Sequence, residues 1–346
     1  MVFVLGIAAM LWAFGHFAGT PVRARWLMIL LLYVAVLVAE VILPQDHIIR
    51  EALGGSKSEW FLLGILGVGL WAYVSGLKWL RARVRPENRP KSEPAKAGES
   101  ELERNARHIV LREIGGPGQK RLREARVLVV GAGGLGSPAL LYLGAAGVGK
   151  IGVIDDDVVS NSNLQRQVIH TDARIGMPKV FSAKAAIEAQ NPYVTVLPYK
   201  RRLTEEISNE LFEDFDLILD GCDNSATRYL VNSAACATGR PLISGALSQW
   251  EGQVSTFAPR DGTPCYRCVF PEPNAPGRAP SCAEGGVLGP LPGVIGTMMA
   301  VEAIKDLTGA GKGLRGRMLI YDALWGETRV VSLKKRASCP VCGSAR

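Results

Sequence analysis

Three long apolar runs stand at the start of the chain, over residues 1–18, 26–43 and 60–80. Each is close to the roughly 20 residues with which an α-helix crosses about 30 Å of hydrocarbon. We therefore expect an all-α membrane anchor in residues 1–86, with about three transmembrane helices. The first run is also open to interpretation as a signal peptide, but it lacks a basic n-region and a clear cleavage site.

The pattern changes twice after these runs. Residues 87–103 are polar and charged, with Pro and Gly and no apolar period, and they predict a linker. From residue 126 onwards, short β-branched runs such as RVLVV and DLILD alternate with helical segments. Apolar strands separated by helices are typical of a mostly parallel sheet covered on both faces. We expect residues 104–346 to form one α/β domain with a doubly wound, Rossmann-like sheet.

Composition and charge support the membrane interpretation. The chain has 346 residues, of which 48% are hydrophobic and 21% charged, and this is too apolar for a disordered protein. Its formal net charge is +8. Basic residues gather after the first and the third apolar run, which by the positive-inside rule places the α/β domain in the cytoplasm. We expect a multi-pass protein of the inner membrane in contact with lipid, and no nucleic-acid binding.

A glycine-rich turn follows the first predicted strand. Its glycines are Gly131, Gly133, Gly134 and Gly136. Glycine permits a tight turn and a close approach of the backbone to a ligand, while the following helix offers free amide groups to a phosphate. Asp155 ends the second strand, where a carboxylate can accept hydrogen bonds from ribose hydroxyls. These features predict a nucleotide site, and up to this point a nicotinamide dehydrogenase fits equally well.

Polar and charged residues near later strand ends favour phosphate chemistry over hydride transfer. They are Ser162, Asn163, Gln165, Arg166, Lys179, Asp223 and Asn224, and we expect Leu164, which lies among them, to belong to the same site. Guanidinium and ammonium groups stabilise charge that develops on phosphates, and a carboxylate can hold magnesium. Each residue alone could be an ordinary surface or capping residue. Their joint occurrence where ligands of such sheets bind favours a phosphoanhydride as the substrate.

The cysteines indicate a metal site. Four of the seven form two Cys-x2-Cys pairs, and these are Cys265, Cys268, Cys339 and Cys342. Two thiolate pairs complete a tetrahedral zinc site with no open position, which makes such a site structural. Disulfides are disfavoured by the cytoplasmic location that we expect. Cys282 has no partner by spacing, and it is open to interpretation as a nucleophile or as an ordinary small residue.

Together these motifs resemble the MoeB/ThiF/HesA family, the bacterial relatives of ubiquitin-activating enzymes. The motifs are GAGGLGSPALLYL, IDDD, SNSNLQRQV, IGMPK, DGCDN, PCYRC, SCAEGGVLGP and CPVCG, in this order. The resemblance implies a nucleotidyltransferase that uses ATP to adenylylate the C-terminal glycine of a ubiquitin-like sulfur carrier. The implied carrier is the small subunit of molybdopterin synthase, in molybdenum cofactor biosynthesis. A thiamine-pathway or other carrier is the alternative, as is a non-catalytic, membrane-tethered nucleotide-binding scaffold.

The resemblance also implies residue roles and partners. Gly134 belongs to the nucleotide loop, Asp155 binds ribose, and Asp223 acts through magnesium. The implied phosphate ligands are Asn163, Arg166 and Lys179. Arg107 reaches the ATP of the other subunit in a homodimer, and Cys282 stands where some members form a covalent link with the carrier. Sulfur is expected to come from a separate persulfide donor.

Overall fold

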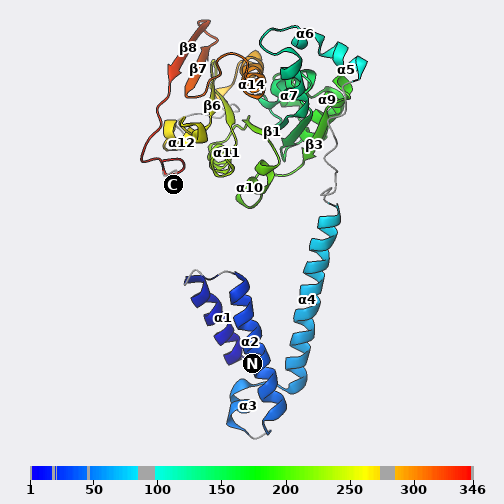
Figure 1. The fold of residues 1–346 in the computed structure, drawn as a ribbon, viewed down its shortest axis with the longest axis vertical. Helices are drawn as coiled ribbons and strands as arrows, with labels where there is room; N and C mark the ends of the chain where they lie inside the picture. Colours follow the sequence, from blue (N-terminus) through cyan, green and yellow to red (C-terminus); the bar gives the residue numbers. More distant parts are fainter. Residues whose placement is uncertain are drawn as a thin grey trace. The chain divides into compact units, whose positions relative to one another are not determined.

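The computed structural model of the protein divides the chain into a helical unit, residues 1–93, and an α/β unit, residues 94–346 (Figure 1). It describes residues 2–17, 20, 22–44, 47–84, 98–272 and 285–343.

The helical unit turns each of the three apolar runs into a helix. Its helices are α1 (Val2–Phe17), α2 (Val22–Ile42), α3 (Ile48–Leu53) and α4 (Lys57–Val84). Among the described residues, one helical stretch, Ala24–Ile42, is long and apolar enough to cross a membrane by length and composition. Helix α1 contributes a shorter apolar stretch, Gly6–Gly15. Three spans therefore remain a prediction.

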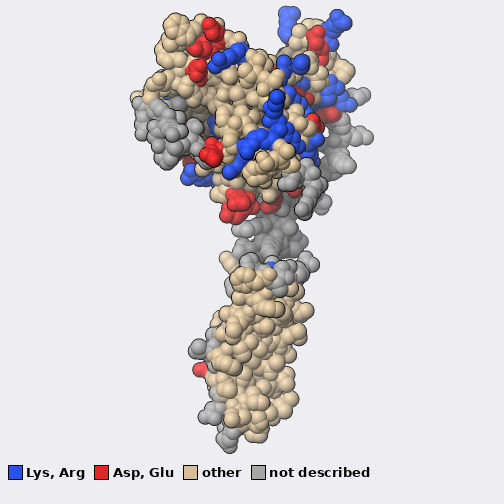
Figure 2. All heavy atoms as spheres, turned by 90° about the vertical axis from the view of Figure 1, so that its left-hand side faces the viewer, with Lys and Arg blue, Asp and Glu red and all other residues tan. Residues whose placement is uncertain are grey.

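Few side chains of the helical unit are buried. Val4, Val36 and Trp60 form a small core, and the Tyr33 hydroxyl donates a 2.7 Å hydrogen bond to the Trp60 carbonyl. Glu40 is 1% exposed and forms an ion pair of 2.9 Å with Arg50. The remaining surface is mostly apolar, and Figure 2 shows almost no charged side chains on this side of the unit.

The α/β unit contains an eight-stranded mixed sheet with the order β3-β2-β1-β4-β5-β6-β7-β8. The strands are β1 (Arg126–Val130), β2 (Lys150–Ile154), β3 (Thr195–Tyr199), β4 (Leu217–Asp220), β5 (Leu242–Leu247), β6 (Glu251–Phe257), β7 (Arg317–Asp322) and β8 (Glu327–Ser332). The first five are parallel, which confirms the Rossmann-like sheet. Strands β6 to β8 are antiparallel, and the sequence analysis did not predict them.

Helices cover both faces of the sheet (Figure 1). They are α5 (Glu99–Arg104), α6 (Ala106–Ile109), α7 (Gly115–Glu124), α8 (Gly136–Ala145), α9 (Lys179–Gln190), α10 (Glu205–Glu213), α11 (Ser225–Thr238), α12 (Tyr266–Val269) and α14 (Pro290–Thr308). Because successive side chains of a strand point to opposite faces, Val127 and Val129 join the core under α8, α9 and α14. Leu128 and Val130 join the second core, under α10 and α11.

Helix α5 begins inside the stretch that the sequence analysis assigned to the linker. Residues 99–103 belong to it, whereas residues 85–97 lie outside the described part of the chain. Glu101 forms an ion pair of 3.1 Å with Arg123 of α7, and this contact fixes the helix on the α/β unit. The sequence did not predict this helix because the segment has few apolar residues. A tertiary ion pair supports the helix instead.

Candidate functional site

A pocket of about 460 Å³ opens at the carboxyl ends of the parallel strands. Eight of the predicted residues line it, and they are Gly131, Gly133, Gly134, Asp155, Arg166, Lys179, Asp223 and Asn224. The strand order reverses between β1 and β4, and ligands of doubly wound sheets bind at such a reversal. The topology therefore brings together residues from the connections that follow β1, β2 and β4.

The glycine turn is shaped by the close approach of its own backbone. Gly131 has φ +95°, a conformation that L side chains rarely adopt. A Cβ atom on Gly136 would lie 1.9 Å from the Gly131 carbonyl oxygen. Gly136 thus allows α8 to start directly against the turn without lining the pocket itself. At Gly133 a Cβ would meet only the Gln167 side chain, at 3.7 Å, so this position is open.

Asp155 ties the glycine turn to the end of β2. Its Oδ2 accepts a 2.7 Å hydrogen bond from the Ala132 amide, and its Oδ1 accepts one of 2.8 Å from the Asp157 amide. Burial raises the pKa of Asp155, and the two amides oppose this shift. Each carboxylate oxygen keeps a lone pair for a ligand.

Lys179 brings a buried positive charge to the pocket. The residue is 4% exposed and opens α9. Its Nζ lies 2.7 Å from Oδ2 of the exposed Asp157. An ammonium group has three donors, so this one has donor capacity for an anion in the pocket.

Arg166 is held by its own loop. Its Nη1 donates to the Ser162 carbonyl at 2.9 Å, and its Nη2 donates to Asn163 Oδ1 at 3.4 Å. Ser162 and Asn163 therefore orient this guanidinium and do not themselves line the pocket.

Three further predicted positions lie elsewhere, and a fourth falls outside the described residues. Leu164 and Gln165 do not line the pocket, and the Gln165 side chain packs against Gly289. Arg107 lies on α6, away from the pocket of its own chain, so its role in a partner's pocket stays a prediction. Cys282 falls outside the described residues.

Sequence reasoning missed other cationic residues of the pocket, namely Arg201, Arg202 and Arg228. Arg201 and Arg202 directly follow β3, so the same rule about strand ends would have found them. Arg228 lies inside α11, where the sequence carries no such signal. Figure 2 shows Lys and Arg side chains interspersed with Asp and Glu on the side of the α/β unit that it presents.

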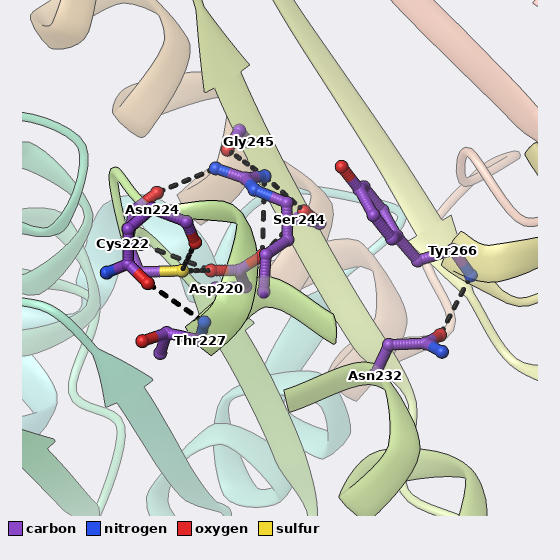
Figure 3. Close-up of polar contacts among 9 residues, drawn as sticks. Asp220, Cys222, Asn224, Thr227, Asn232, Ser244, Gly245 and Tyr266 are labelled. Carbon is purple, nitrogen blue, oxygen red and sulfur yellow. Dashed lines mark hydrogen bonds and ion pairs between the residues drawn. The ribbon is translucent and has the colours of Figure 1, made fainter. Parts of the chain in front are cut away.

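A buried polar cluster closes the pocket at the end of β4 (Figure 3). Asp220 is 0% exposed, and its Oδ2 accepts from Ser244 Oγ at 2.9 Å and lies 3.3 Å from Arg228 Nη1. Its Oδ1 accepts from the Cys222 thiol at 2.6 Å. Burial raises the pKa of Cys222 well above its usual value. Burial opposes the charge on Arg228, but the acidic groups around it, of which the Asp220 carboxylate contributes most, together outweigh burial and raise the pKa of Arg228. The cluster therefore holds one ion pair and one neutral thiol.

His170 fixes the glycine turn from behind. Its Nε2 lies 2.9 Å from the Ala132 carbonyl and its Nδ1 lies 2.9 Å from Ser182 Oγ. Because a carbonyl only accepts, Nε2 carries the proton and Nδ1 accepts from the serine. Burial lowers the pKa of His170, which keeps the ring neutral. Ala132 is thus held at its amide by Asp155 and at its carbonyl by His170.

The four predicted ligand cysteines come together in a buried cluster. The sulfur atoms of Cys265, Cys268, Cys339 and Cys342 all lie within 4.8 Å of one another. The Sγ atoms of Cys265 and Cys339 are 3.6 Å apart, and those of Cys268 and Cys342 are 3.3 Å apart. Sulfur atoms about 3.8 Å apart form a tetrahedron around zinc with bonds of about 2.3 Å. The donor set and its spacing are compatible with zinc.

Comparisons with known proteins agree with this geometry. The model of the ThiF family matches residues 105–341. A sulfur carrier protein adenylyltransferase of Thermus thermophilus is 49% identical over 247 residues, which cover 70% of this chain and 91% of that protein. The probable adenylyltransferase/sulfurtransferase MoeZ of Mycobacterium tuberculosis is 51% identical over 255 residues, or 72% of this chain.

The comparisons differ in how much of each protein they cover. The match spans 65% of the mycobacterial protein's length, and the match to the ThiF family model begins at residue 105, after the helical unit. The crystal structure of E. coli MccB with ATP superposes with a TM-score of 0.59 at 20% identity, covering 66% of this chain and 70% of that one. This likeness shows a shared fold.

The lowered pKa of His170 makes stability depend on pH. Below the ordinary value of 6.5 the unfolded chain binds a proton that the folded chain resists, so stability falls as the pH drops. This loss is at most about 1.4 kcal/mol per pH unit. The His170→Gln side chain keeps a donor and an acceptor but does not titrate. We therefore expect this variant to lose less stability than the parent when the pH is lowered. Thermal unfolding of both proteins at pH 7.5 and 5.5 measures it, and equal losses would contradict the assignment.

Proposed function

Because this chain belongs to the ThiF family, we propose that it is an ATP-dependent adenylyltransferase for the C-terminal glycine of a ubiquitin-like sulfur-carrier protein. The observation that carries the proposal is the 49% identity to a sulfur carrier protein adenylyltransferase over 91% of that protein's length. The pocket supports it, because a glycine turn, cationic side chains and a carboxylate line one cavity. We propose that the carrier is the small subunit of molybdopterin synthase, with a thiamine-pathway carrier as the alternative.

The reaction requires two anions to meet. A carboxylate oxygen of the carrier's glycine attacks the α-phosphorus of ATP, the bond to the bridging oxygen breaks, and pyrophosphate leaves. Cations must offset the repulsion between the carboxylate and the triphosphate before an in-line attack is possible. Arg166 and Lys179 line the pocket for this task. The proposed magnesium would neutralise phosphate charge, and Asp223 would hold it.

The scaffold alternative explains the pocket less well. A scaffold that binds a nucleotide without chemistry has no need for a full set of charged residues, yet Arg166, Lys179 and Asp223 all line the pocket. Lys179 is 4% exposed, and its ion-pair partner, Asp157, is an exposed residue. Burying a charge without full compensation is costly. An anionic ligand bound beside Lys179 would compensate this buried charge.

Two further partners belong to the proposal. A homodimer would place Arg107 of one chain in the pocket of the other. The persulfide of a separate donor would attack the adenylylated glycine and displace AMP. A thiol would then reduce the resulting acyl disulfide and release the carrier as its thiocarboxylate.

We also propose a structural zinc ion held by the four-cysteine cluster. The cluster joins two segments that are 74 residues apart, since Cys265 meets Cys339 and Cys268 meets Cys342. The Arg336 amide donates to Cys268 Sγ at 3.4 Å, as amides do around metal-bound thiolates. The proposed zinc would fasten the segment after β8 to α12.

For the helical unit we propose a multi-pass position in the inner membrane, with lipid around α2 and the α/β unit on the cytoplasmic side. Only 11% of the Ala24–Ile42 stretch is buried. Trp26, Leu30 and Val41 are all more than half exposed. In water, apolar surface of this kind costs about 25 cal/mol per Å², and lipid removes the cost.

Removal of the buried ammonium tests the enzyme assignment. We expect Lys179→Ala to lower carrier-dependent exchange of pyrophosphate into ATP by about 100-fold or more, because a preorganised charge is lost. Lys184→Ala is the matched control, since Lys184 lies on the same helix and pairs with Glu188 in solvent. Exchange by Lys179→Ala at the level of this control would refute the role of Lys179.

The zinc proposal predicts a loss of metal and of stability together. Cys339→Ala should reduce bound zinc to a small fraction of one equivalent and lower the melting temperature by roughly 5–10 °C. Cys236 packs beside the cluster without belonging to it, so Cys236→Ala should keep the zinc. Metal analysis and calorimetry measure both effects. Unchanged melting in a zinc-free Cys339→Ala protein would contradict the structural role.

The membrane proposal predicts how the two units partition. The full chain should remain with bacterial membranes after an alkaline carbonate wash and enter solution with detergent. Residues 94–346 form a compact unit and should appear in the soluble fraction. Recovery of the full chain in the soluble fraction would contradict the proposal.

A further inference from the structure

Arg228 contacts the residue immediately before Asp223, the proposed magnesium ligand. Its Nη2 donates a 2.6 Å hydrogen bond to the Cys222 carbonyl. Its Nη1 donates to the Gly245 carbonyl at 2.8 Å and to Ser244 Oγ at 2.9 Å. One guanidinium group therefore joins the loop after β4 to the middle of β5 (Figure 3).

The turn that carries Asp223 has few other supports. The Cys222 amide donates to Asp220 Oδ1 at 3.1 Å, before the turn. Asn224 Oδ1 accepts from the Thr227 amide at 2.9 Å, after the turn. Asp223 itself is exposed to the pocket. The Cys222 thiol also donates to the Asn224 carbonyl, at 3.8 Å, within the same loop. The hydrogen bond from Arg228 to the Cys222 carbonyl is the contact that ties this loop to β5.

Tyr266 holds Arg228 from the opposite direction. The Arg228 guanidinium carbon lies 5.8 Å from the centre of the Tyr266 ring, within the range of a cation–π contact. Tyr266 stands on α12, between Cys265 and Cys268. Its amide donates to Asn232 Oδ1 at 2.9 Å, and this hydrogen bond docks α12 on α11 (Figure 3). A continuous series of contacts therefore leads from the cysteine cluster to the pocket.

We propose that Arg228 is a positioning residue that sets the Asp223–Asn224 turn for nucleotide binding, and that Tyr266 holds Arg228 in place from the cysteine-bearing helix. The inference rests on the proposed function, because it assumes that the pocket binds ATP. It adds a second task for the cysteine cluster, which supports the nucleotide site through these two side chains.

The test measures ATP affinity in the presence of magnesium by calorimetry on the full chain in detergent. Arg228→Lys keeps the charge beside Asp220 but loses the forked donors, and it should weaken ATP binding by about 10-fold or more. Tyr266→Leu should weaken it by about 3- to 10-fold. Tyr266→Phe keeps the ring and should bind as the parent does. Tyr142→Leu is the control, because it removes a ring of α8 that is 55% exposed and does not line the pocket.

A double-mutant cycle identifies the route. If Arg228 acts through the turn, Arg228→Lys should add little to the loss already caused by Asp223→Ala. Additive losses would overturn the route. The inference is overturned if Arg228→Lys and Tyr266→Leu both bind ATP with the parent's affinity. It is also overturned if only the fraction of binding-competent protein falls, because the two side chains would then have a merely structural role.

Two readings separate this inference from the function on which it rests. A parent chain that binds no ATP refutes the proposed function itself. Zinc content, measured on every variant, shows whether the Tyr266→Leu protein keeps its cluster. A zinc-loaded Tyr266→Leu protein with weakened ATP binding supports the proposal, and full affinity in that protein refutes it. If Arg228→Lys fails to fold, the Tyr266 variants decide alone.

Discussion

The reversal of strand order at β1 is the constraint on which the α/β unit depends. Strands β2 and β3 extend the sheet to one side of β1, and β4 and β5 extend it to the other, all in parallel. The connections that leave β1 and β4 therefore run to opposite faces, and a crevice opens between them. The glycine turn, Asp155 and the Asp223 turn all arise at this edge. The order of the strands therefore creates the pocket, and the loops after the strands supply its polar side chains.

Each charged group that is buried at the end of an apolar sheet needs its own hydrogen-bond or ion-pair partner. Asp220 ends a fully buried strand, and each of its oxygens has partners: Cys222 on one, Ser244 and Arg228 on the other. A buried ion pair contributes little net stability, but loss of one partner costs about 3–5 kcal/mol. The main effect of the ion pair is therefore to fix the position of the end of β4 relative to α11, and its contribution to stability is small.

Periodicity and spacing predicted the parts of the molecule that follow local rules. The five parallel strands are short apolar runs, the glycine turn follows the first of them, and the two cysteine pairs meet as their spacing indicated. Among the antiparallel strands, β8 was not predicted because it is exposed along its length and its only apolar residues are Val330 and Val331. Arg228 escaped for a different reason: its partners lie on β4, β5 and α12, and only the tertiary fold brings them to one helix position. The roles of Ser162 and Asn163 were also invisible, because both act on a neighbouring arginine.

The cysteine cluster also bears on the order in which the chain folds during synthesis. Strands β1 to β5 are complete by residue 247, whereas Cys265 must wait for a partner 74 residues further along the chain. Closing so long a loop carries an entropy cost that grows with its length. The parallel half of the sheet can therefore assemble on the ribosome well before the cluster closes. A nascent chain in that interval exposes the thiols of Cys265 and Cys268 without their partners, so the proposed zinc ion would be acquired only late in synthesis.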